Sequence, residues 1–66
     1  MAENAFSPDD VVLLELVARG WTTRRISEHR SRSTRNVSNQ LRDIRCRLDA
    51  RTNIHAVAIA IRQGLL

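Results

Sequence analysis

Apolar residues recur at helical spacing along most of this chain, and no segment shows the alternation of a β-strand. Residues 11–18 carry a broad apolar face of leucine and valine. The Ser-Pro-Asp-Asp run at residues 7–10 favours a helix start, because it offers a cap, a proline for the first helical position and two acids for the positive end of the helix dipole. Gly20 supplies a stop. The pattern predicts a first helix over about residues 8–19, after a short, flexible tail at residues 1–6.

A short helix, a tight turn and a longer helix are predicted in the middle of the chain. Thr22 or Thr23 can cap a second helix that runs to about His29. Residues 31–33 fit a turn, and the serine that ends this turn can cap the next helix. The third helix is predicted over about residues 34–48. Its apolar residues follow at spacings of four, three and four, so they lie on one face: Val37, Leu41, Ile44 and Leu48.

The opposite face of this third helix is predominantly basic and polar. It collects Arg35, Ser38, Asn39, Arg42, Arg45 and Cys46. The predicted third helix is therefore amphipathic, with one aliphatic side and one side rich in hydrogen-bond donors.

A fourth helix is predicted over about residues 53–63, capped by Thr52 or Asn53, and it is apolar nearly all round. One side groups Ile54, Val57, Ala58, Ile61 and Leu65, and the other groups Ala56, Ile59 and Ala60. A helix that is apolar on every side must be covered on every side. Because a chain of 66 residues can cover only one face, the second face predicts self-association.

Together the segments predict an all-α, four-helix bundle-like domain over residues 7–66, whose second and third helices form a helix-turn-helix. Phe6 and Trp21 are the only aromatic residues. Their scarcity argues against a β-sandwich or barrel, and against a stacking platform for single-stranded nucleic acid. The chain has no room for a catalytic domain with its own pocket, and it carries no nucleophile motif or glycine-rich loop, so we expect no enzyme.

Charge is concentrated in the middle of the chain. Residues 1–18 hold four acids and no basic residue, whereas residues 19–51 hold ten arginines against three acids. Such a basic segment is typical of a phosphate-binding surface, and the alternative is a charged face that is merely solvated.

The remaining chemistry-bearing residues predict little. Cys46 is the only cysteine, so no intramolecular disulfide forms; a plain surface thiol is expected, with a redox switch as the alternative. His29 and His55 lack metal-ligand spacing, so we expect no metal and no cofactor. No run is long enough for a membrane span and no signal peptide is evident, which predicts a cytoplasmic, nucleoid-associated protein without membrane contact.

The second helix of a helix-turn-helix enters the major groove of double-stranded DNA. Ser38, Asn39 and Arg42 lie near its entering end, where Arg42 can pair with guanine and Asn39 with adenine. Phosphate contacts position the protein without reading sequence. They are expected from Thr22, Thr23, Arg24, Arg25, Thr34, Arg35, Arg45 and Arg47.

Several segments at these spacings resemble the LuxR-type helix-turn-helix, also called the GerE or NarL/FixJ type. They are residues 6–10, 14–20 and 56–58, with Ile26, Ser33, Val37, Ile44 and Leu48 between them. The resemblance covers residues 6–66 without gaps. It implies a four-helix domain that binds operator DNA, usually as a dimer through the fourth helix. By position, base reading falls on Ser38, Asn39 and Arg42, and the homodimer interface on Ala56, Ile59 and Ala60.

The chain departs from that family at the turn. Arg30 and Arg32 stand where the family usually has apolar residues, and Arg25 stands where an acid often closes a capping box. A buried, unpaired arginine costs several kcal/mol. The two turn arginines must therefore point outward, pair with Glu28 or another acid, or reach DNA phosphates. Three interpretations stay open: a rearranged turn, an enlarged DNA-facing surface, or a motif that no longer binds DNA.

Trp21 stands where the family has an aliphatic residue, and we expect it to pack between the first two helices. For the whole chain we expect a sequence-specific, DNA-binding transcription regulator. The alternative is a protein-interaction module on a degenerate helix-turn-helix, which pairs through the fourth helix with a larger regulator and modulates it.

Overall fold

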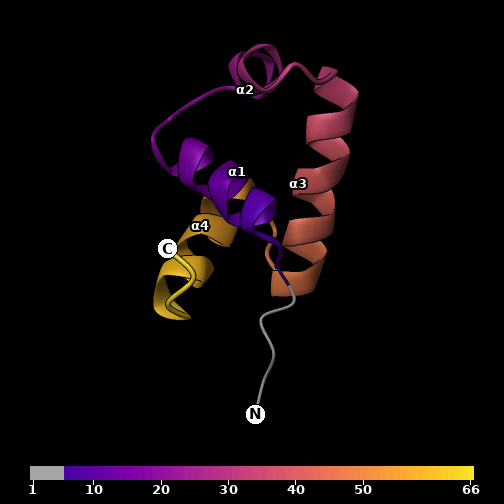
Figure 1. Ribbon diagram of the computed structural model, residues 1–66. Helices are drawn as coiled ribbons and strands as arrows, with labels where there is room; N and C mark the ends of the chain where they lie inside the picture. Colours follow the sequence, from indigo (N-terminus) through magenta and orange to yellow (C-terminus); the bar gives the residue numbers. More distant parts are fainter. Residues whose placement is uncertain (1–5) are drawn as a thin grey trace.

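The computed structural model describes residues 6–66, which fold into four helices packed against one another. In chain order they are α1 (Pro8–Ala18), α2 (Thr23–Arg30), α3 (Thr34–Leu48) and α4 (Asn53–Arg62). The long α3 forms one side of the molecule, α2 lies across its N-terminal end, and α1 and α4 lie beside its remaining length (Figure 1). No strand occurs between residues 6 and 66, so the all-α class is confirmed.

Each helix begins after a hydroxyl side chain that accepts a backbone hydrogen bond. Ser7 accepts from the backbone of Asp10, whose carboxylate accepts from the backbone of Ser7 in return, which makes a complete capping box. Thr22, Ser33 and Thr52 cap the other three helices. The two cap positions that the sequence left open therefore fall on the first residue of each pair.

Three helix ends differ by one residue from the sequence prediction. The helix α1 ends at residue 18, α2 at residue 30 and α4 at residue 62. Two of the ends are set by residues in the left-handed region, Ser31 with φ 54° after α2 and Asp49 with φ 55° after α3. Neither residue is a glycine, so each end stores some backbone strain.

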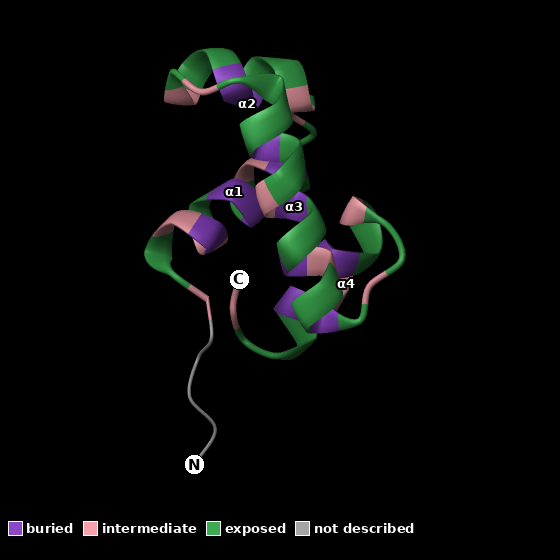
Figure 2. Cartoon of the chain, turned by 90° about the vertical axis from the view of Figure 1, so that its right-hand side faces the viewer, coloured by how far each residue is buried: buried purple, intermediate pink, exposed green. Residues whose placement is uncertain are grey.

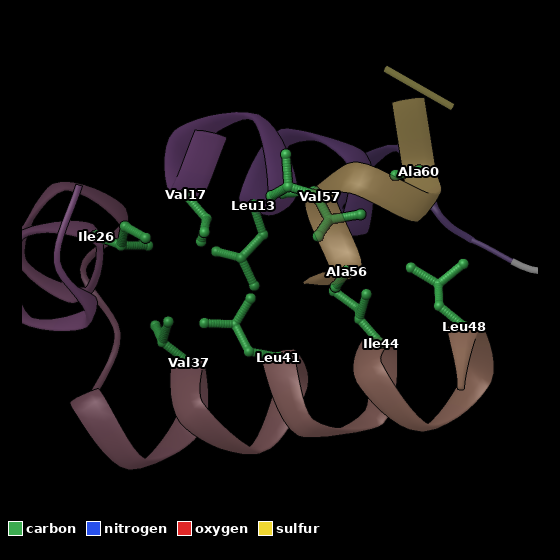
Figure 3. Close-up of a cluster of buried hydrophobic side chains, with 11 residues drawn as sticks. Leu13, Val17, Ile26, Val37, Leu41, Ile44, Leu48, Ala56, Val57 and Ala60 are labelled. Carbon is green, nitrogen blue, oxygen red and sulfur yellow. The ribbon is translucent and has the colours of Figure 1, made fainter. Parts of the chain in front are cut away.

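The core is built on the aliphatic seam of α3 (Figure 3). Val37, Leu41, Ile44 and Leu48 are all buried, as the spacing predicted. Opposite this row lie side chains from the three other helices, namely Leu13 and Val17 of α1, Ile26 of α2, and Ala56, Val57 and Ala60 of α4. Leu14 of α1 belongs to the same buried cluster. Each fully buried leucine or isoleucine contributes roughly 1.5–3 kcal/mol, so this seam is what fixes the orientation of α3.

The face that α4 turns to the core draws on both apolar sides predicted from the sequence, because Val57 of the Ile54 group is buried together with the alanines of the other group. Ala56 and Ala60 are buried, whereas the side chains of Ile54 and Ile61 are 71% and 57% exposed. Small alanines at the contact let two helices approach closely, and this favours the alanine side. Ala56 and Ala60 consequently have no exposed surface to offer a partner, which argues against them as the dimer contact.

The first residue that the structure describes, Phe6, packs against the core. Phe6, which the sequence placed in the tail, is half-buried against the core, and the rest of that predicted tail lies outside the described residues. Within residues 6–66, none of the helices combines the length and the apolar character that crossing a bilayer requires.

Candidate nucleic-acid interface

The turn between α2 and α3 is short and is held by a backbone hydrogen bond. Ser31 takes the left-handed conformation, and the backbone N–H of Arg32 donates to the carbonyl of Ser27 at 2.9 Å. Ile26 of α2 and Val37 of α3 are both fully buried and belong to the same core cluster (Figure 3). The shared core therefore joins the two helices of the motif, although arginines and not apolar residues stand at the turn.

The predicted base-reading residues lie on the outer side of α3. Ser38, Asn39 and Arg42 are all exposed (Figure 2 shows this helix in green along its outer side). Arg35 lies on the same stripe, since it stands four residues before Asn39. In the part of the chain that the structure describes, the side chains of these four residues make no hydrogen bond or ion pair. Their hydrogen-bonding groups are therefore available to a ligand.

The predicted phosphate-binding residues of α2 differ in how they are engaged. The exposed Arg24 forms an ion pair with Glu28, one turn along, at 3.5 Å. Arg25 instead lies over the ring of Trp21, with its guanidinium carbon 3.9 Å from the ring centroid. Thr22 uses its hydroxyl to cap α2, so that oxygen already has a partner. Thr23 is half-buried.

Two of the predicted phosphate-binding arginines of α3 reach toward other parts of the protein. Arg45 is half-buried and donates to the side chain of Asn53 at the start of α4. A guanidinium nitrogen of Arg47 lies 3.8 Å from the carboxylate of Asp10. The sequence predicts phosphate contacts for both, but the structure gives each a role in joining helices. Thr34, at the start of α3, is exposed.

Arg30 and Arg32 are both held by a single carboxylate, that of Asp9 in the first turn of α1. Arg30 pairs with one oxygen of Asp9 and Arg32 with the other, the latter at 2.9 Å. Gln40 of α3 completes the cluster: it accepts from Arg32 at 2.8 Å and donates to Asp9 at 2.9 Å and to Asp10 at 2.8 Å. We call Asp9, Arg30, Arg32 and Gln40 the turn network.

The turn network answers how the chain tolerates two arginines at this position. Of the options that the sequence left open, the structure uses pairing with an acid, and the acid is Asp9 rather than Glu28. The hydrogen bond from Gln40, and then the one from Arg32, lower the pKa of Asp9 below the ordinary aspartate value, against the opposing effect of burial. The turn network thus stands where a LuxR-type domain is expected to have apolar residues.

Sequence reasoning missed Asp9 and Gln40 as partners of the turn. The sequence indicates for Asp9 only a favourable interaction with the dipole of the first helix, and Gln40 lies 31 residues further along the chain. No local pattern links such positions, because the contact depends on how α1 packs against α3. The unexplained pair of arginines was the one available signal, since it required an acid nearby.

A shallow groove of about 550 Å³ adjoins the turn network on the side of α3. It is lined by Arg32, Asn36, Asn39, Gln40 and Asp43. The groove brings amide and carboxylate groups beside the predicted base reader Asn39, so this edge of α3 is polar but not purely basic.

Cys46 is an exposed free thiol on the outer side of α3, as the sequence predicted. No group of three or more potential metal ligands occurs among residues 6–66. The sequence matches no protein-family profile and no curated protein. The resemblance to LuxR-type domains accordingly stays a prediction that rests on the residues quoted for it.

Proposed function

We propose that this protein is a sequence-specific DNA-binding regulator of transcription that places α3 in the major groove of double-stranded DNA. The observation that carries the proposal is the outer stripe of α3. Arg35, Ser38, Asn39 and Arg42 are exposed and unengaged, while the opposite side of the same helix is fixed in the core. A major groove about 12 Å wide accepts one helix presented in this way.

In this proposal Ser38, Asn39 and Arg42 read base edges, and arginines around them bind phosphates. Arg25 and Arg35 are free of ion pairs within residues 6–66, so they are the strongest phosphate ligands in our assignment. Arg24, Arg45 and Arg47 already have protein partners and contribute less. We assign Arg30 and Arg32 to holding the turn, because the turn network satisfies them without DNA.

The exposed face of α4 supports a dimer as part of the same proposal. Ile54, Ala58 and Ile61 follow at helical spacing, and the two isoleucines are largely exposed. A homodimer through this face would set two α3 helices against two half-sites of an operator. The same exposed isoleucines favour the second candidate function, in which the domain pairs with a larger regulator protein rather than with itself.

Selection of bound fragments from a random duplex pool tests DNA recognition without knowledge of the operator. We expect the full chain to enrich a motif at moderate salt. Asn39→Ala and Arg42→Gln should each relax one position of that motif, at a cost of about 1–3 kcal/mol. Arg62→Gln, on α4 and outside the helix-turn-helix, is the matched control and should select the wild-type motif.

Two results would overturn the proposal. One is the absence of enrichment together with binding weaker than micromolar at low salt, which would favour the protein-interaction module. The other is enrichment of the same motif by Asn39→Ala, Arg42→Gln and the wild type, which would show that α3 does not read the bases.

A further inference from the structure

Trp21 stands just before the cap of α2, and its ring contacts two side chains of that helix. The guanidinium carbon of Arg25 lies over the ring at 3.9 Å from its centroid. His29, one turn further along α2, approaches edge-on, with ring centroids 5.2 Å apart and an interplanar angle of 80°. Trp21 is half-buried, whereas Arg25 and His29 are exposed. The half-buried ring of Trp21 thus supports the long and exposed side chain of Arg25.

This arrangement leaves the hydrogen-bonding edge of Arg25 open. A guanidinium that stacks on a ring uses its flat face, whereas its five N–H donors lie in its own plane and point to the sides of the contact. Within residues 6–66 Arg25 has no carboxylate partner, in contrast to its neighbour Arg24, which is paired with Glu28. The free positive charge at the start of α2 is therefore that of Arg25.

The surroundings of Arg25 favour a bound anion. The first turn of α2 contains no acid that would repel an anion. The start of a helix also carries a partial positive charge. In a helix-turn-helix, the first helix of the motif crosses the DNA backbone while the second lies in the groove. The open edge of Arg25 fits the bidentate geometry of one phosphodiester group.

We propose that Trp21, with His29 against its ring, is a positioning residue that holds Arg25 as a clamp for one phosphate of duplex DNA. Holding a long side chain in its bound conformation removes part of the entropy that binding would otherwise lose. The inference rests on the proposed function, since it needs duplex DNA to be the ligand. It adds a role for Trp21 beyond its packing against the core.

The test measures binding of the full chain to a nonspecific 30-base-pair duplex, labelled for fluorescence anisotropy, across a salt series. The variants are Arg25→Lys, which keeps the charge but loses the planar fork, Arg25→Gln, which removes the charge, Trp21→Leu, and the double variant of Trp21→Leu with Arg25→Lys. Arg62→Lys is the matched control. Circular dichroism verifies folding, and Trp21→Met replaces Trp21→Leu if the latter lacks the native helical spectrum.

We expect Arg25→Lys to weaken binding by about threefold to tenfold when Trp21 is present. In the Trp21→Leu background the same change should cost less than about twofold, because the stack is already gone. Arg25→Gln should reduce the slope of log affinity against log salt by about one phosphate, close to 0.9. Arg62→Lys should bind as the wild type does.

Equal costs of Arg25→Lys in both backgrounds would overturn the clamp while leaving DNA binding intact. Wild-type affinity in a folded Trp21→Leu or Trp21→Met variant would do the same. Failure of the wild type itself to bind the duplex at low salt would overturn the proposed function, and the clamp with it.

Discussion

Replacing Asp9 by Asn is the most direct test of the turn network. The change keeps the shape of the side chain but removes the charge that faces Arg30 and Arg32. It also converts one accepting oxygen into an NH₂ group, which donates toward side chains that are themselves donors. The guanidinium groups would then lie partly buried without their carboxylate, with side-chain exposures of 28% and 33%.

The expected cost follows from that exposure. Charge-assisted hydrogen bonds contribute about 1.5–3 kcal/mol when buried, whereas fully exposed ion pairs contribute below about 1 kcal/mol. For two pairs that are each about one-third exposed, we expect Asp9→Asn to lower the free energy of unfolding by about 2 kcal/mol. A domain of this size has roughly 3–10 kcal/mol in total, so the change is large.

Urea unfolding followed by circular dichroism measures this loss, and a thermal midpoint lower by about 8–16 °C should accompany it. Asp43→Asn is the matched control, because Asp43 is exposed and has no ion pair within residues 6–66. The control should change the free energy of unfolding by less than about 0.5 kcal/mol.

The pH dependence supplies a second signature. Because the pKa of Asp9 is lowered in the folded protein, its contribution to stability is present above the unfolded-state pKa, near pH 4, and is lost as the pH falls through the lower folded value. The difference between wild type and Asp9→Asn should be constant from about pH 5 to 8 and should shrink below about pH 4. An Asp9→Asn variant as stable as Asp43→Asn at neutral pH would refute the reasoning.

Three further outcomes are expected. The triple variant Asp9→Leu, Arg30→Leu, Arg32→Leu places apolar residues at the turn, and its free energy of unfolding in urea should equal that of the wild type or exceed it by about 1–4 kcal/mol; a loss would show that the polar network specifies the turn. Asp49→Gly should stabilise the domain by about 0.5–1 kcal/mol, because Asp49 has φ 55° at the end of α3; an unchanged urea midpoint would contradict this. Ile61→Glu should leave the monomer folded but abolish any dimer seen by sedimentation, since Ile61 is 57% exposed, whereas an unchanged mass of a wild-type dimer would exclude this face of α4.

The turn network consists of charged and polar side chains at a position where apolar side chains could also pack. A buried ion cluster stabilises less than well-packed apolar residues of the same volume, but removing one partner of it is costly. Because of this asymmetry, we expect the single variant to lose stability and the triple variant to keep or gain it. Because stability is measured without DNA, these variants also separate the structural role of Arg30 and Arg32 from any role in DNA binding.

The sequence by itself determined the helices of this protein and the aliphatic seam of α3 on which the core is built. Helix starts depend on a hydroxyl cap and a few following residues, and the seam of α3 depends on spacing within one helix, so both can be read locally. Val37 and Leu48 are buried as that spacing requires, and Ser38, Asn39 and Arg42 lie exposed on the opposite side.

Only the tertiary structure decided which face of α4 is buried and what satisfies the turn. The helix is apolar on several sides, so its pattern holds no preference, and close approach to α1 and α3 selects Ala56 and Ala60 over Ile54. The partnership of Asp9 with Arg30 and Arg32 joins residues more than 20 positions apart. Such contacts arise from the packing of whole helices, which no local spacing encodes.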